Sequence, residues 1–280
     1  MYFEKFHGTG NDFIIIENLN NELDLICNQS DLTKQICNRH FGIGADGMMI
    51  VCGSEIADIK MMFYNQDGSI APMCGNGIRC FAKYVYDKKI VNNTIFTVET
   101  LAGTMKVELI ESQETISFIR INLGYPEFNT VQFPIDTDKE KVIDEKIAVG
   151  NRELKISTLN MGTIHTVLYT ENLNNVDIDK IGKTIEEHEL FPEKTNVNIY
   201  EINDHENITL ETYERGVGRT LACGTGCAAT AVISNLLNNT SKSVNVHVRG
   251  GILKIEISND GVFMTGPTER ICKGEYIVKH

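Results

Sequence analysis

Two cysteines stand where the chain is best suited to acid–base chemistry. Cys74 and Cys223 each begin a Cys-Gly-x-Gly pattern, and apolar residues at helical spacing follow both. A thiol at a helix N-terminus meets unpaired N–H groups and the positive end of the helix dipole, which lower its pKa and favour the thiolate. The same N–H groups bind anions such as a carboxylate. Four glycines are expected to let the backbone approach a ligand closely, namely Gly75, Gly77, Gly224 and Gly226.

A pair of such thiols suits the inversion of a carbon centre next to a carboxylate. Inversion by proton exchange needs a base on one face of the carbon and an acid on the other, and two equivalent thiols can exchange these roles. Donors already in place at the helix ends stabilise the negative charge that develops as the proton leaves. We therefore expect two helix starts that face each other across a small anionic substrate.

The sequence repeats itself once, which predicts that the two helix starts are equivalent. The residues Cys74 to Gly77 match Cys223 to Gly226 after 149 residues, and 103–109 match 251–257 after 148. Near the start of each half, Gly8-Thr9 matches Gly162-Thr163. Three matches in the same order indicate two copies of one unit. We predict two pseudo-symmetric domains that mix helices and strands.

Local patterns predict similar elements in both halves. Residues 98–109 and 244–257 alternate apolar and polar around a glycine, which is typical of hairpins. Asp31 is expected to cap a helix that runs to about His40, and Asp177 to begin the matching helix. The segment 123–138, with two prolines, is interpreted as the crossing between the halves. The last strand is expected near 276–278 and is compatible with either half.

Composition limits the class of protein. The 280 residues carry a net charge of −12. A nucleic-acid-binding protein usually carries an excess of basic residues, so the composition argues against that class. No apolar run approaches the 18 or so residues of a membrane span, and the first residues lack the regions of a signal peptide. We expect a cytoplasmic protein with no nucleic-acid or membrane partner. No lysine stands in a recognisable pyridoxal-phosphate setting, so no cofactor is predicted.

Other candidate residues have simpler interpretations. Cys74 and Cys80 have five residues between them, which fits zinc ligands poorly, and no metal is predicted. Cys80 and Cys227 lie inside their helices and are expected to be core residues. The acidic run 186–189 is interpreted as a solvated helix face.

Seven motifs spread over almost the whole chain resemble those of the diaminopimelate epimerase family, the two-cysteine amino-acid epimerases that use no pyridoxal phosphate. Each motif alone is a weak signal, and the order and spacing of all seven together make the resemblance specific. The motifs are His7-Gly8-Thr9-Gly10-Asn11-Asp12-Phe13, residues 42–47, Phe63-Tyr64-Asn65-Gln66-Asp67-Gly68, residues 73–80, Thr195-Asn196-Val197, Glu214-Arg215-Gly216 and residues 222–226.

The resemblance implies a role for each matching position. Cys74 and Cys223 would be the acid and the base. The N–H groups of residues 75, 76, 224 and 225 would hold the reacting carboxylate, and the other residues would line the pocket. The implied substrate-binding residues are Asn11, Asn65, Gly75, Asn76, Thr163, His165, Asn196, Glu214, Arg215, Gly224 and Thr225.

The resemblance also implies a fold of the α+β class. Each of two pseudo-symmetric domains would wrap a mostly antiparallel set of strands around a central helix, with the active site in the cleft between them. The first domain would span residues 1–122, with the tail 269–280 returning to it, and the second would span 123–268. The resemblance leaves a homodimer open.

Two positions depart from the family pattern and bear on the substrate. Thr163 stands where the family usually has Asn, and Arg219 stands where it usually has Glu. A substrate group left without a hydrogen bond costs about 1–3 kcal/mol. The first hypothesis is therefore a racemase of another amino acid, with histidine the leading candidate. A diaminopimelate epimerase and a non-catalytic module that binds small carboxylates are the alternatives.

Overall fold

The chain divides into two compact units, and each is described by itself. The computed structural model describes residues 1–112, 115–150 and 152–278. Unit 1 comprises Met1–Ile121 and Gly266–His280, and unit 2 comprises Asn122–Thr265. None of the helices in the described ranges is long and apolar enough to cross a membrane.

Unit 1 is a sheet of mixed direction around one long helix. Its elements are β1 (Tyr2–Gly8), β2 (Asn11–Glu17), α1 (Leu23–Ile26), α2 (Gln29–Ile36), β3 (Gly47–Cys52), β4 (Ile59–Asn65), β5 (Ile70–Ala71), α3 (Gly75–Asp87), β6 (Ile95–Thr100), β7 (Gly103–Ser112), β8 (Thr115–Asn122) and β18 (Glu269–Glu275). The pairing order is β18, β1, β2, β3, β4, β6, β7 and β8, with short β5 on β4. Only the β2–β3 and β4–β6 pairs among these are parallel.

Unit 2 repeats this arrangement strand for strand. Its elements are β9 (Val142–Val149), β10 (Arg152–Asn160), β11 (Ile164–Tyr169), α4 (Ile178–Glu186), β12 (Asn196–Asp204), β13 (Asn207–Glu214), β14 (Gly218–Arg219), α5 (Gly224–Leu236), β15 (Ser243–Val248), β16 (Gly251–Ser258), β17 (Gly261–Pro267) and two short 3₁₀ turns, Thr130–Gln132 and Leu173–Asn175. The order runs from β9 to β13 and on through β15 to β17, with β14 on β13. The parallel pairs, β11–β12 and β13–β15, are the counterparts of those in unit 1. The predicted repeat and the α+β class are confirmed.

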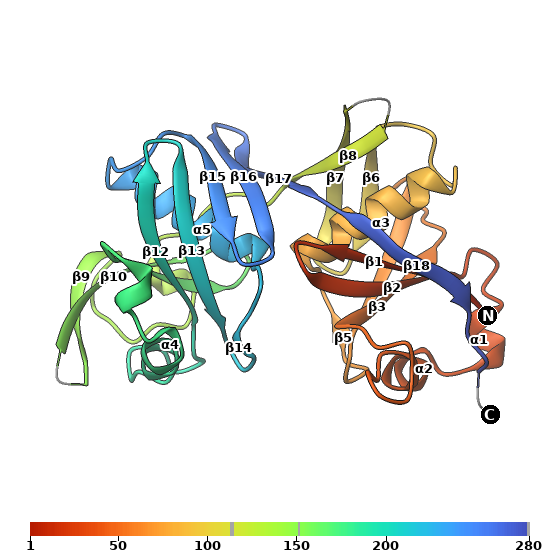
Figure 1. Ribbon diagram of the computed structural model, residues 1–280, viewed down its shortest axis with the longest axis horizontal. Helices are drawn as coiled ribbons and strands as arrows, with labels where there is room; N and C mark the ends of the chain where they lie inside the picture. Colours follow the sequence, from red (N-terminus) through yellow and green to blue (C-terminus); the bar gives the residue numbers. More distant parts are fainter. Residues whose placement is uncertain (113–114, 151, 279–280) are drawn as a thin grey trace. The chain divides into compact units, whose positions relative to one another are not determined.

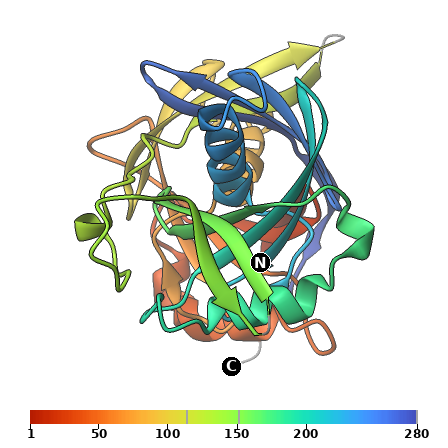
Figure 2. The same cartoon turned by 90° about the vertical axis from the view of Figure 1, so that its left-hand side faces the viewer.

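The central helices α3 and α5 are the core of their units. Figure 1 shows α3 running beside β1, β2 and β7, which it contacts. Figure 2 shows α5 enclosed by strands of unit 2, and it packs on β10, β11, β12, β15 and β16. Ile78, Phe81 and Val85 of α3 are fully buried, and α5 is buried around almost its whole circumference. Each large apolar side chain contributes about 1.5–3 kcal/mol when buried.

The second glycine of each Cys-Gly-x-Gly pattern serves packing inside the protein. A Cβ at Gly77 would lie 2.1 Å from Met49 Cε, and one at Gly226 would lie 2.4 Å from Asn198 Oδ1. Met49 and Asn198 lie on the equivalent strands β3 and β12. These two glycines therefore lack a Cβ because a side chain of a neighbouring strand fills the space that it would occupy.

Other predicted elements are mostly confirmed, with shifted ends. The hairpins β6–β7 and β15–β16 lie where the alternation placed them, and Asp177 caps α4. The helix expected from Asp31 instead begins at Gln29, because Asn28 accepts the N–H of Asp31 and caps α2. The last strand, β18, ends before residue 276 and pairs with β1 of unit 1. Residues 279 and 280 of the expected tail lie outside the described residues.

Candidate active site

Cys74 and Cys223 occupy the same place in the two units, as the N-caps of α3 and α5. Both have extended backbone, and each helix has 13 residues that begin with a glycine. The Cys74 sulfur accepts the N–H of Gly77 at 3.4 Å. An α-helix provides no i−4 carbonyl for its first-turn N–H groups, which here belong to Gly75 and Asn76 in α3 and to Gly224 and Thr225 in α5. Each cysteine thus lies beside donors suited to an anion.

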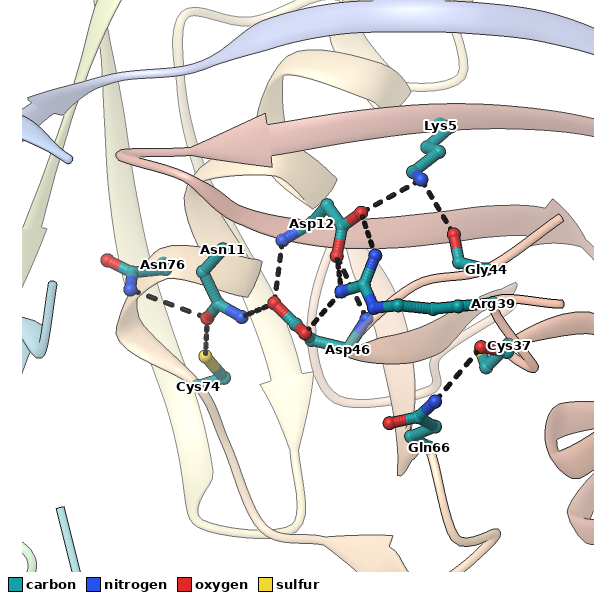
Figure 3. A network of polar contacts seen from close by, with 10 residues as sticks. All are labelled: Lys5, Asn11, Asp12, Cys37, Arg39, Gly44, Asp46, Gln66, Cys74 and Asn76. Atoms are coloured by element: carbon teal, nitrogen blue, oxygen red, sulfur yellow. Dashed lines mark hydrogen bonds and ion pairs between the residues drawn. The ribbon is translucent and has the colours of Figure 1, made fainter. Parts of the chain in front are cut away.

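In unit 1, Asn11 joins the two predicted residues at the start of α3. Asn11 Oδ1 lies 3.6 Å from Cys74 Sγ and 3.4 Å from Asn76 Nδ2 (Figure 3). Thr9 donates to the other end of the Asn76 amide at 3.4 Å. Asn65 lies at the end of β4, where its amide donates to Ser69 at 3.0 Å. The structure therefore gathers Asn11, Cys74 and Asn76 into one hydrogen-bonded cluster.

Two carboxylates and two cations lie on the side of Asn11 that faces away from Cys74, and no chemical pattern in the sequence pointed to them. Arg39 binds both oxygens of Asp12, at 2.8 and 3.1 Å, and Asp46 at 2.7 Å. Lys5 binds Asp12 at 2.8 Å. Burial alone would raise the pKa of Asp12, but the hydrogen bonds from Arg39 and Lys5 outweigh it and lower the pKa to about 2. Asp12 and Asp46 do fall in two of the quoted motifs, and that was their only signal.

In unit 2, His165 connects the predicted residues to Cys223. Its Nε2 lies 3.1 Å from Thr163 Oγ1 and 3.0 Å from Thr225 Oγ1. The Thr225 hydroxyl lies 3.5 Å from Cys223 Sγ. These contacts join β11, the turn before it and the first turn of α5. Four of the predicted residues thus form one chain of hydrogen bonds that ends at the thiol.

Asn198 fixes the protonation of His165. The Asn198 NH₂ faces His165 Nδ1 at 3.1 Å, and its Oδ1 accepts the Thr212 hydroxyl at 3.2 Å. Nδ1 must then accept, and the single ring proton lies on Nε2, facing the two threonines. His165 is fully buried, and burial, with a smaller effect from the charge of Arg215, lowers its pKa to about 3. His165 is therefore a neutral hydrogen-bond donor near neutral pH.

Asn196 ties the Thr163 turn to the Arg215 loop. Its NH₂ donates to Ile164 O at 2.9 Å and to Thr163 Oγ1 at 3.4 Å, while its Oδ1 accepts the Arg215 N–H at 3.0 Å. Asn196 is buried, whereas Thr163 and Arg215 are exposed. One amide therefore sets the separation of two loops that the motifs had singled out.

The acidic run 186–189 is not uniformly solvated, which corrects its prediction. Glu186 is 4 % exposed, and its carboxylate accepts the N–H of Gly216 at 2.8 Å. Lys194 approaches the same oxygen at 3.6 Å. Its neighbour Glu187 is exposed, as the pattern indicated. Glu186 therefore holds the loop that carries Arg215, and nothing in the run distinguishes it from its neighbours.

Arg219 pairs within its own sheet. Its guanidinium binds both carboxylate oxygens of Glu211, each at 2.8 Å, from the neighbouring strand β13. A bidentate pair of this kind pairs the charge of the guanidinium and fixes the direction in which the side chain points. Glu211 thereby neutralises the positive charge of Arg219.

The surroundings of the Cys223 thiol shift its pKa in both directions. Burial, and next the negative charge of Glu214, raise the pKa of Cys223. The Thr225 hydroxyl and the Gly226 N–H act in the opposite direction.

Cys80 and Cys227 are fully buried, which confirms them as core residues. Burial raises the pKa of Cys80 to about 12. Across the described ranges, no group of three or more potential metal ligands gathers.

The comparisons with known proteins agree over the full length. A family model described as Diaminopimelate epimerase matches residues 3–128 and 157–271. The chain is 45 % identical over 276 residues to the diaminopimelate epimerase of Caldanaerobacter subterraneus, covering 98 % of this chain and 99 % of that protein. It is 44 % identical to that of Clostridium perfringens, covering 99 % and 100 %.

Solved structures show the same fold at much lower identity. A Bacillus anthracis phenazine biosynthesis protein of the PhzF family gives a TM-score of 0.70 at 14 % identity, with 99 % of each chain covered. A hydroxyproline epimerase from Agrobacterium vitis gives 0.66 at 12 % identity, with 98 % of this chain and 90 % of that chain covered.

Proposed function

Because this chain belongs to the diaminopimelate epimerase family, we propose that it inverts one α-carbon of diaminopimelate and so interconverts the LL and meso forms. The chain is an isomerase of the racemase and epimerase class. The observation that carries the choice of substrate is the full-length identity of about 45 % to relatives named diaminopimelate epimerase.

The hypothesis of histidine as the substrate is not supported. The relatives give no indication of it, and they favour the alternative of diaminopimelate. One argument for an altered substrate was the charge of Arg219, which is bound by Glu211. The other was the loss of an amide at 163, yet the Thr163 hydroxyl keeps hydrogen bonds to Asn196 and His165.

In the proposed reaction, Cys74 and Cys223 act as base and acid on one α-carbon. The thiolate of one removes the α-proton and becomes a thiol, and the thiol of the other gives its proton to the opposite face and becomes a thiolate. The reverse reaction exchanges the two roles. Support comes from the matching N-cap positions of the two cysteines.

The first turns of α3 and α5 are proposed to hold the α-carboxylate. As the α-proton leaves, negative charge spreads onto the carboxylate oxygens, and fixed N–H donors stabilise it. The N–H groups of Gly75, Asn76, Gly224 and Thr225 are the proposed donors. The proposed pocket also includes Asn11, Asn65, Thr163, His165, Asn196, Glu214 and Arg215.

Proton exchange in D₂O tests the substrate. The purified enzyme, under reductant and without pyridoxal phosphate, would be incubated with LL-diaminopimelate or with L-histidine, and deuterium at Cα followed by NMR. We expect exchange in diaminopimelate and none in histidine. Exchange in histidine alone would overturn the proposed substrate, and exchange in neither would favour a non-catalytic carboxylate-binding module.

Cysteine variants test the mechanism in the same assay. Cys74→Ala and Cys223→Ala should each lower the rate of inversion by at least about a hundredfold, the range of a lost general acid or base. Cys272→Ala is the matched control, because Cys272 is an exposed free thiol on β18. Inversion that survives either active-site change would refute a two-thiol reaction.

A further inference from the structure

The direction of the Asn11 amide is dictated by Asp46. Asn11 Nδ2 lies 2.5 Å from Asp46 Oδ2, and an ionised carboxylate accepts hydrogen bonds but donates none. The end of the amide that faces Asp46 must therefore be its NH₂. Its oxygen then points the other way, to the start of α3 (Figure 3).

That oxygen faces the Cys74 sulfur at 3.6 Å. An acceptor in this place is compatible with an S–H donor and disfavours a thiolate, whereas an NH₂ in the same place would favour the thiolate. Asn76 Nδ2 also donates to this oxygen, at 3.4 Å, and so supports the same orientation from a second side. The sulfur also accepts the Gly77 N–H, so the Asn11 amide decides whether the sulfur meets an acceptor or a second donor.

Asp46 is itself held firmly. Its second oxygen binds Arg39 at 2.7 Å, and the Asp12 N–H donates to the first oxygen at 3.1 Å. The Asp46 N–H in turn donates to Asp12 Oδ1 at 3.0 Å. Lys5 binds Asp12, so two cations balance two carboxylates. The network therefore fixes Asp46 without leaving a net charge of its own.

We propose that Asp46 is a positioning residue for Cys74, which holds the Asn11 amide so that its oxygen, and not its NH₂, meets the sulfur. Asp46 acts only through Asn11, and its carboxylate does not touch the thiol. The proposal rests on the proposed function only in taking Cys74 as one of the two acid–base groups. In the resting enzyme this arrangement favours the S–H form of Cys74, which can give a proton.

The variant Asp46→Asn reverses the orientation. Two donors compete for the single oxygen of the variant side chain, the charged Arg39 guanidinium and the neutral Asp12 N–H. The charged donor binds more strongly, so Arg39 retains the oxygen and the new NH₂ takes the position that faces Asn11.

Two NH₂ groups then oppose each other, and the Asn11 amide turns to offer its oxygen to residue 46. The Asn76 amide turns with it, so that its oxygen accepts from Asn11 and its NH₂ faces the Thr9 hydroxyl, which can also accept. The Asn11 NH₂ then faces Cys74 and favours the thiolate.

The test is the rate at which iodoacetamide alkylates Cys74 across a range of pH, measured by peptide mass spectrometry in the absence of substrate. We expect Asp46→Asn to raise this rate at pH 7 about three- to tenfold, because exchanging one hydrogen-bond acceptor for a donor changes the thiolate population by about that factor. Cys223 in the same sample should keep its rate. Glu99→Gln is the matched control, since Glu99 also pairs with a cation in unit 1, Lys60 at 2.8 Å.

The double variant shows whether Asp46 acts through Asn11. Asn11→Ala alone should also speed alkylation of Cys74, because the acceptor is gone, and Asp46→Asn should add nothing on that background. An equal effect of Asp46→Asn on both backgrounds, or no effect on the wild-type background in a variant with an unchanged melting temperature, would overturn the proposal. Alkylation needs no turnover, so failure of the diaminopimelate assay would count against the proposed function alone.

Discussion

Neutral His165 makes unit 2 sensitive to acid, and the size of the effect follows from its surroundings. The ring is fully buried, and burial lowers its pKa to about 3, against a value near 6.5 for an unfolded chain. Between pH 3 and pH 6.5 the histidine binds a proton in the unfolded state but not in the folded state. Stability is therefore complete above about pH 6.5 and declines as the pH falls towards 3.

Integrating this difference from pH 7 to pH 5 gives a loss of about 2 kcal/mol from this one histidine. The variant His165→Gln removes the titration while leaving a side chain that can donate to the threonines. At pH 7 it should be less stable than the wild type by about 1–3 kcal/mol, because the Asn198 NH₂ loses its acceptor. At pH 5 the gap should be smaller by about 2 kcal/mol.

Urea unfolding of both proteins at the two pH values, followed by far-ultraviolet circular dichroism, measures the gap. Contributions from all other titrating groups are common to the two proteins and cancel in the difference. Exposed His205 supplies the control, since His205→Gln should show the same stability gap at both pH values. A gap for His165→Gln that does not narrow at pH 5 would refute the assignment of a neutral buried imidazole.

Two further predictions concern packing and the Arg215 loop. Gly182→Ala should destabilise the protein by about 1–3 kcal/mol in urea unfolding although alanine favours helices, because its Cβ would lie 2.5 Å from an aromatic ring. At Gly53, with no heavy atom within 4 Å, the same change should be nearly neutral, and equal losses at both sites would contradict this account. Glu186→Gln should raise the KM for diaminopimelate several-fold with little change in kcat, because a neutral amide accepts the Gly216 N–H more weakly than the carboxylate and no longer attracts Lys194. Glu187→Gln, one residue along the chain, should leave KM unchanged, and a similar rise there would point to a general charge effect.

The sequence by itself determined the repeat, the elements and the two cysteines. Apolar periodicity, glycine turns and capping residues act over a few residues, so hairpins and helices are visible without the fold. The N-cap positions of Cys74 and Cys223 follow from such local signals. The motifs along the whole chain indicated the family. The strand order in the two units agrees with the repeat in the sequence.

Tertiary structure alone decided the partners of the polar side chains. Asn11 meets Asp46 only because β2 and β3 pair in parallel, and His165 meets Asn198 only because β11 and β12 do. Glu186 is buried because a loop from another strand covers it. The direction of an amide, the tautomer of a histidine and the burial of a carboxylate depend on donors and acceptors brought from distant positions, because hydrogen bonding and desolvation are set by neighbours in space.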